Sequence, residues 1–183
     1  MAEGVRTSGA TRLWSMRAGF ALIALATILF NLMPLETTPR RWAGPDLLVV
    51  LVFAWSVRRP DYAPTALVAV LVFLADLMFQ RPPGLFAALV VLASEWLRMR
   101  GRTMHELPFV AEWLAAAGAM TAVVLANRAI LAIMFTSLPP LSLSLMQLIA
   151  SIAIYPVVVL FCRTFFGLRK LTHADFDMRG QNP

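Results

Sequence analysis

The chain has 183 residues, of which 60% are hydrophobic and only 14% are charged, and its mean hydropathy is +0.74. A soluble domain is about half apolar and about a quarter charged, so this composition excludes a water-soluble globule and indicates an integral membrane protein made almost entirely of its spans. The formal net charge of +6 does not indicate nucleic-acid binding, because the basic residues occur in short groups between apolar segments, as membrane topology requires.

Six apolar segments follow one another along the chain and predict an all-α fold of six transmembrane helices. In chain order they are Ala18–Pro34, Pro45–Val57, Ala63–Phe79, Gly84–Leu97, Pro108–Phe135 and Leu141–Phe161. The first follows three arginines, as a signal peptide would, but it is long for a signal core and no convincing small-x-small cleavage site follows, so we expect it to be retained. An alternative with four or five spans would merge two segments. The strong breaks at Pro60-Asp61-Tyr62 and Pro82-Pro83-Gly84 favour six.

The second and fourth segments are short for transmembrane helices. A helix of their length covers about 20 Å at about 1.5 Å per residue, against a hydrocarbon core about 30 Å thick. We therefore expect each of them either to extend into its basic flank or to lie sheltered by longer neighbours.

The basic residues predict the orientation. With six spans, twelve of the 16 Lys and Arg residues fall on the side of both termini, three fall on the other side, and Arg128 lies within the fifth span. Because Lys and Arg are retained on the cytoplasmic side of a membrane, we expect both termini to be cytoplasmic. The predicted parts are a cytoplasmic N-terminus at 1–17, a membrane domain at 18–162 and a cytoplasmic tail at 163–183. The five tryptophans, at positions 14, 42, 55, 96 and 113, are expected at the membrane interfaces.

Three charged residues are predicted to share the outer half of the membrane, namely Asp46, Asp76 and Arg128. Asp46 follows Pro45 at the start of the second helix, where a carboxylate favours the positive end of the helix dipole. A pair between Arg128 and Asp76, with Asp46 nearby, would lower the cost of burying these charges. Such a cluster is either structural, a site for a ligand or partner, or part of an ion pathway. An ion pathway usually needs polar groups through the full membrane thickness, which the second segment lacks.

Two short turns carry further charges. Arg81, Pro82, Pro83 and Gly84 cannot continue a helix and predict a tight reversal after the third span. On the opposite side, Arg58, Arg59, Pro60 and Asp61 form a predicted cytoplasmic turn, which serves either topology alone or contact with a cytoplasmic partner. Near the same inner ends, Glu95 is expected to reach a basic neighbour, and Glu112 to favour the dipole at the start of the fifth helix.

The sequence lacks the usual motifs of catalytic and metal sites. It has no H-E-x-x-H, no Cys/His cluster, no Gly-rich phosphate loop and no G-x-S-x-G motif, and both histidines, His105 and His173, fall in predicted cytoplasmic segments. A single cysteine, Cys162, allows no internal disulfide and is read as a small apolar residue. We therefore expect a protein that is not an enzyme and has no cofactor or metal.

Four short motifs resemble those of the rod shape-determining MreD family. They are Pro45-Asp46-Leu47-Leu48, Arg58-Arg59-Pro60-Asp61-Tyr62, Leu74-Ala75-Asp76-Leu77 and Arg81-Pro82-Pro83-Gly84-Leu85. The resemblance covers roughly residues 14–165 and is most specific between Asp46 and Leu85. One departure is Pro83, where the family's usual turn has Leu.

The resemblance implies a non-enzymatic component of the bacterial machinery for cell elongation and lateral peptidoglycan synthesis. Its implied partners are an MreC-like protein, filaments of the actin-like MreB, the synthase formed by RodA and a class B penicillin-binding protein, and membrane lipids. Its implied fold is that of the substrate-binding subunits of energy-coupling-factor vitamin transporters. Two alternatives remain open: a small-molecule-binding subunit of such a transporter, and an enzyme acting on a lipid-linked precursor.

Overall fold

The computed structural model describes residues 2–33, 43–103, 108–135 and 140–166. These residues form an all-helical structure, and six helices are described in it. The helices are α1 (Ala2–Leu32), α2 (Leu47–Arg58), α3 (Thr65–Met78), α4 (Leu85–Thr103), α5 (Phe109–Ile133) and α6 (Leu141–Phe166). Each corresponds to one predicted segment, and both proline breaks separate helices, so no two segments merge. The predictions for Trp42, His105, His173 and the tail after Phe166 lie outside the described residues.

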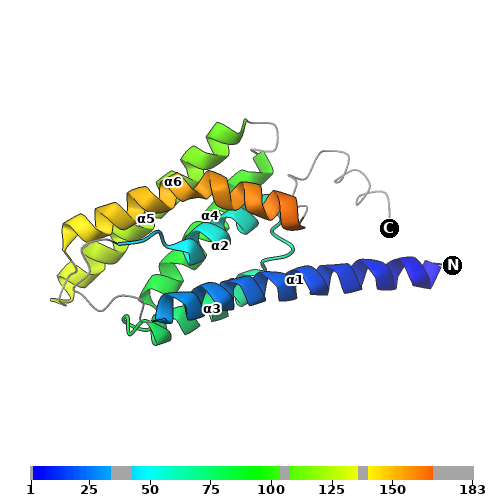
Figure 1. Ribbon diagram of the computed structural model, residues 1–183, viewed down its shortest axis with the longest axis horizontal. Helices are drawn as coiled ribbons and strands as arrows, with labels where there is room; N and C mark the ends of the chain where they lie inside the picture. Colours follow the sequence, from blue (N-terminus) through cyan, green and yellow to red (C-terminus); the bar gives the residue numbers. More distant parts are fainter. Residues whose placement is uncertain (1, 34–42, 104–107, 136–139, 167–183) are drawn as a thin grey trace.

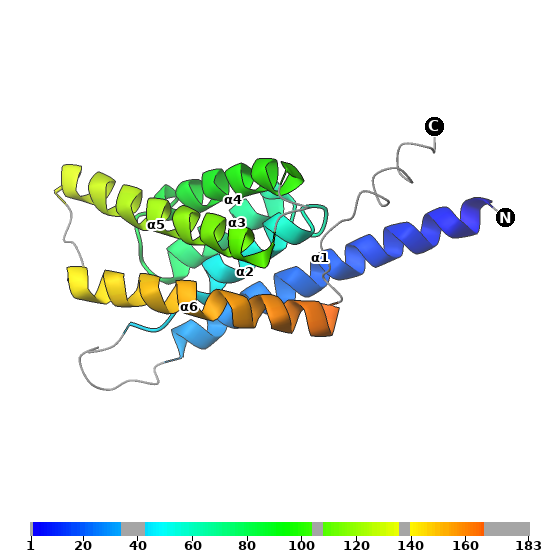
Figure 2. The same ribbon diagram turned by 90° about the horizontal axis from the view of Figure 1, so that it is seen from above.

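The helices run alternately in opposite directions. The start of α1 and the end of α6 lie at one end of the bundle, together with the turn between α2 and α3 (Figures 1 and 2). The turn between α3 and α4 lies at the other end, beside the end of α5 and the start of α6. This alternation matches the order that the predicted topology requires.

Helix α2 lies at the centre of the bundle and packs against α1, α4, α5 and α6 (Figure 1). Its sequence, LLVVLVFAWSVR, is apolar on every side, and every residue from Leu48 to Arg58 is buried. A helix that is apolar all round must be buried all round, which explains this central place. The prediction that a short segment is sheltered by longer neighbours is thus confirmed for α2. For helix α4 the other alternative holds, because this helix extends through its basic flank to Thr103.

The outer surface of the bundle is strongly apolar. Among the residues that the structure describes, three helical stretches are long and apolar enough to cross a membrane: 11–32 within α1, and the whole of α5 and α6. Helices α2 and α3 are shorter apolar helices. Large apolar side chains are exposed on the outward faces, for example Leu92, Leu125 and Leu160. An apolar surface this extensive is compatible with insertion into a lipid bilayer and untypical of a soluble monomer.

Trp55 corrects one expectation, because it belongs to the core and not to an interface. Its exposure is 0%, and its ring lies 5.1 Å from the Phe20 ring and 5.5 Å from the Phe166 ring, measured between centroids. The indole Nε1 donates a hydrogen bond to the Cys162 Sγ at 3.3 Å. The central position of α2 leaves its side chains no route to the membrane surface. In contrast, Trp14 is 67% exposed, as an interfacial residue would be.

Candidate functional site

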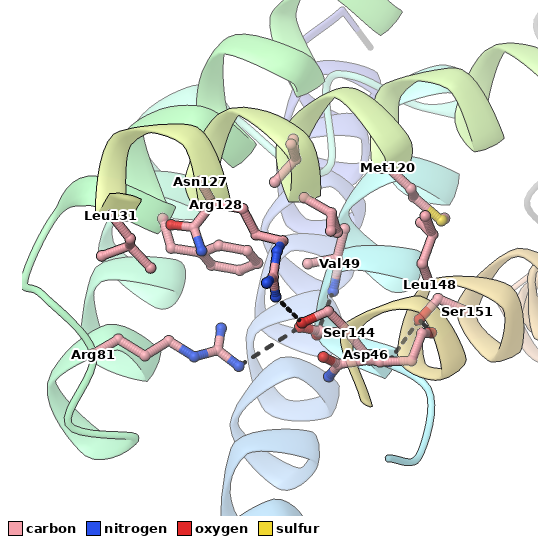
Figure 3. A pocket seen from close by; sticks show the side chains of 14 residues that line it. Asp46, Val49, Arg81, Met120, Asn127, Arg128, Leu131, Ser144, Leu148 and Ser151 are labelled. Carbon is pink, nitrogen blue, oxygen red and sulfur yellow. Dashed lines mark hydrogen bonds and ion pairs between the residues drawn. The ribbon is translucent and has the colours of Figure 1, made fainter. Parts of the chain in front are cut away.

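Polar groups gather at both ends of the buried helix α2. At its first residues they line a cavity of about 140 Å³, which we call the α2 N-terminal cavity (Figure 3). The described residues that line it are Asp46, Val49, Arg81, Phe86, Met120, Val123, Val124, Asn127, Arg128, Leu131, Ser144, Gln147, Leu148 and Ser151. They come from α2, α4, α5, α6 and the turn between α3 and α4, so five parts of the chain meet here.

Asp46 is the residue that caps α2. Its carboxylate Oδ1 accepts a hydrogen bond from the Val49 N–H at 3.3 Å, which satisfies one of the backbone donors left over at a helix start. Its own N–H donates to the Ser151 Oγ of α6 at 2.8 Å. The predicted position of Asp46 at the beginning of the second helix is therefore confirmed, and α6 anchors that position.

Arg81 reaches the cavity from the turn between α3 and α4. Its guanidinium lies over the rings of Phe79 and Phe86, 5.2 Å and 4.6 Å from their centroids. Its Nη2 is 3.9 Å from the Asp46 Oδ2. Stacking on two aromatic faces restricts the guanidinium to one direction and holds it toward the cavity.

Arg128 enters the same cavity from α5. Its Nη1 donates a hydrogen bond to the Ser144 Oγ of α6 at 2.8 Å (Figure 3). The structure thus brings together Asp46 and Arg128 of the predicted charge cluster and adds Arg81. Sequence reasoning assigned Arg81 only to the turn. It also missed Ser144 and Ser151, although their i, i+7 spacing places them on one face of a helix.

Asp76 has a different role from the one expected. Its residue exposure is 0%, and its Oδ2 accepts a hydrogen bond from the Ala87 N–H at 3.0 Å. Ala87 is in the first turn of α4, so Asp76 caps that helix from the preceding one. Asp76 Oδ1 has no hydrogen-bond partner in the described part of the chain, and Asp76 is not one of the described residues that line the cavity. Asp76 therefore holds the turn and does not line the cavity.

The reversal after α3 is as tight as predicted. The Arg81 N–H donates to the Asp76 carbonyl at 3.0 Å, and Gln80 and Gly84 adopt φ values of 53° and 86°. A positive φ is easily reached only by Gly, so Gly84 is the residue that lets the chain enter α4 directly after two prolines. This compact turn brings the Asp76 carboxylate over the start of α4.

The other end of α2 carries a buried ion pair. Arg58 Nε donates to the Glu112 Oε1 at 2.8 Å and Arg58 Nη2 to the Glu112 Oε2 at 3.2 Å. The Tyr155 hydroxyl donates to the same Oε1 at 3.2 Å. The three side chains are buried and come from α2, α5 and α6. The three side chains thus join these helices. The guanidinium and the carboxylate meet through two hydrogen bonds side by side, which is the geometry of the strongest charge-assisted hydrogen bonds.

This ion pair corrects the reading of Arg58 as a contact residue. Arg58 is buried, whereas Arg59, Pro60 and Asp61 are half-buried in the turn that follows. Arg59 lies 5.9 Å from the Tyr62 ring centroid, and the Asp61 carbonyl accepts from Arg17 Nε at 3.0 Å. Glu112 lies in the first turn of α5 as expected. Its position in the sequence did not predict its partner, because Arg58 is 54 residues away.

Glu95 behaves as the sequence predicted. Its Oε1 lies 3.0 Å from the Arg98 Nη1, one helical turn further along α4, and also accepts a hydrogen bond from the Thr65 hydroxyl. The Arg98 guanidinium donates in turn to Thr65 and to the Ala63 carbonyl. These hydrogen bonds join the start of α3 to α4.

Within the described part of the chain, no group of three or more His, Cys, Asp and Glu residues could hold a metal ion. None of the family models, curated proteins or solved structures with which the chain was compared matches it.

Proposed function

We propose that the chain is a non-enzymatic inner-membrane component of the machinery that elongates rod-shaped bacteria, similar to MreD. In this proposal all six helices span the membrane, both termini are cytoplasmic, and the fold resembles that of energy-coupling-factor substrate-binding subunits. The protein binds membrane partners: an MreC-like protein, the synthase of RodA and a class B penicillin-binding protein, and, directly or through these, MreB filaments.

One observation carries the proposal: three of the four motifs behind the family resemblance form a connected unit at the start of α2, while the fourth lies at the other end of that helix. Asp76 holds the turn that starts α4, and Arg81 extends from that turn toward Asp46 at the start of α2. The contact between Arg81 and Asp46 joins two motifs that are far apart in the sequence, which chance matches in an apolar sequence would have no reason to do. The unit supports a shared architecture, and the large apolar faces of α3 and α4 supply surface for partner helices.

A second candidate function is a small-molecule-binding subunit of a vitamin-type transporter. The α2 N-terminal cavity favours it, because such a subunit needs a cavity lined by polar groups from several spans. Its volume of about 140 Å³ argues against it, since sites for drug-sized ligands occupy about 300–1,000 Å³. A partner-binding role therefore remains the stronger proposal.

Photo-crosslinking in the native host tests this choice. A photoreactive amino acid replaces Val70 on α3 or Leu92 on α4, which are exposed apolar residues of different helices. The matched control carries it at Leu125, an equally apolar and exposed residue of α5. We expect α3 or α4 to capture an MreC-like or synthase subunit, identified by mass spectrometry, in higher yield than Leu125 does.

The outcomes separate the candidates. Capture of only an ATPase-coupling subunit would replace the elongation proposal by the transporter one. Capture of the same proteins at all three positions in equal yield would indicate random collision in the bilayer and count against a specific surface. Turnover of a lipid-linked precursor by the purified protein would overturn the non-enzymatic role.

A further inference from the structure

Arginines outnumber acidic residues in the lining of the α2 N-terminal cavity. Among the described residues that line it, the charged ones are Arg81, Arg128 and Asp46, with a formal net charge of +1. Asp76 lies outside the lining but interacts electrostatically with Arg81 and with Asp46. Because two carboxylates lie near the arginines, an anion with a single negative charge meets less repulsion here than a dianion would.

The described neighbours of the Arg81 guanidinium fix its direction without accepting hydrogen bonds from it. Its distance of 3.9 Å from the Asp46 carboxylate exceeds the 2.7–2.9 Å of a charge-assisted hydrogen bond. Within the described part of the chain it makes no side-chain hydrogen bond, while Phe79 and Phe86 fix its direction. A planar fork held in this way is suited to bidentate contact with the oxygens of a phosphate group.

Arg128 faces the same cavity from α5. Its hydrogen bond to Ser144 places the guanidinium beside a row of α6 polar groups, continued by Gln147 and Ser151 (Figure 3). Asn127 adds an amide from α5. Two guanidinium groups from separate elements, with hydroxyl and amide groups around them, form a receptor for a tetrahedral oxyanion.

The remaining lining is apolar. Met120, Val123 and Val124 of α5 and Leu148 of α6 continue from the polar groups along the two helices. A ligand with an anionic head and an apolar extension would find matching surfaces side by side. The mixed lining distinguishes this cavity from the predominantly apolar groove formed by Ile23, Phe30, Phe161 and their neighbours.

We propose that the α2 N-terminal cavity of about 140 Å³ binds the phosphate group of a phosphodiester monoanion, while the rest of the ligand extends beyond the cavity. The phosphodiester is carried either on a lipid headgroup or on a free soluble molecule. Arg81 and Arg128 bind the phosphate oxygens, Ser144 and Gln147 hydrogen-bond to the same head, and Asp46 restricts the site to a single negative charge. The site does not depend on the elongation role, so either proposal can fail alone.

The test uses the full chain purified in dodecyl maltoside, a detergent without phosphorus. Short-chain phosphatidylglycerol, its deacylated headgroup glycerophosphoglycerol and a neutral diacylglycerol of the same chain length are titrated by isothermal calorimetry. Arg81→Gln and Arg128→Gln each remove one receptor group. Arg100→Gln is the matched control, because Arg100 is exposed on α4 and lies over the Trp96 ring.

We expect each cavity variant to bind phosphatidylglycerol at least tenfold more weakly than the wild type does, and the control to stay within twofold, since a charge-assisted hydrogen bond contributes more than a tenfold change in affinity. Binding of the lipid alone assigns the site to a lipid headgroup. Equal affinity for glycerophosphoglycerol assigns it to a free phosphodiester.

Binding of the wild type to phosphatidylglycerol and glycerophosphoglycerol no stronger than to the diacylglycerol would overturn the proposal without any variant. So would an equal loss in Arg100→Gln, which would indicate a general surface charge effect. If a glutamine variant fails to fold, Arg81→Lys and Arg128→Lys keep the charge but lose the fork. They are then expected to weaken phosphodiester binding by a smaller factor, and unchanged affinity in both would exclude bidentate recognition.

Discussion

Replacing Glu112 by Gln removes one charge from the buried pair at the C-terminal end of α2. The Glu112 side chain is 0% exposed and receives two hydrogen bonds from Arg58, at 2.8 Å and 3.2 Å. The amide keeps the shape of the carboxyl group but cannot balance the guanidinium. Arg58, which is itself buried, then remains charged without its counter-ion.

The expected loss is about 3–5 kcal/mol in the free energy of unfolding, the usual cost of leaving one member of a buried ion pair uncompensated. Removing both charges, in Arg58→Met with Glu112→Leu, is expected to recover most of this loss, because a buried pair replaced by apolar groups of similar size is often neutral or stabilising. Tyr155→Phe removes only a single hydrogen bond to Glu112, and about 1 kcal/mol is expected.

Unfolding in mixed micelles of dodecyl maltoside and SDS, followed by tryptophan fluorescence, measures these differences. Glu95→Gln is the matched control. It also removes a carboxylate paired with an arginine, but the Glu95 side chain is 38% exposed, so a loss of no more than about 1 kcal/mol is expected.

Two results would refute this reasoning. One is a loss below about 1 kcal/mol for Glu112→Gln, which would mean that water or another group already screens Arg58. The other is strict additivity of the two single changes in the double variant, which would mean that the side chains do not interact energetically.

Three further changes test other parts of the fold by the same unfolding assay. Gly84→Ala is expected to lower the free energy of unfolding by about 1 kcal/mol, because Gly84 has a φ of 86°. Gly118→Ala is the control and should be neutral or stabilising, because Gly118 lies inside α5 with open space at the position of a Cβ. Equal effects of the two changes would contradict the role of the turn. Asp76→Ala is expected to cost about 1–2 kcal/mol through loss of the α4 cap, and a silent variant would remove that role. Trp55→Ala is expected to lower the free energy of unfolding by about 3–5 kcal/mol, whereas Trp14→Ala, at an exposed position, is expected to lower it by less than about 1 kcal/mol. Similar losses in the two variants would contradict the core position of Trp55.

The helices were predictable because their signals are local. Apolar run length and the prolines at 60, 82 and 83 define six segments, and α2 to α6 begin within two residues of the predicted starts. The cap at Asp46 and the pair of Glu95 with Arg98 were also predictable, since each joins residues three or four positions apart. Only α1 begins much earlier, at Ala2, because helical structure continues beyond the apolar run.

The sequence by itself thus determined the number of helices, their order, and the tight turn before α4. Only the tertiary structure decided which charged groups meet. Arg58 with Glu112 and Arg128 with Ser144 join different helices, and hydropathy gives the depth of a residue along a helix but not the direction in which its side chain points. Asp76 shows the difference most clearly. Its predicted depth matched that of Arg128, but the geometry of the turn directs its carboxylate to the start of α4.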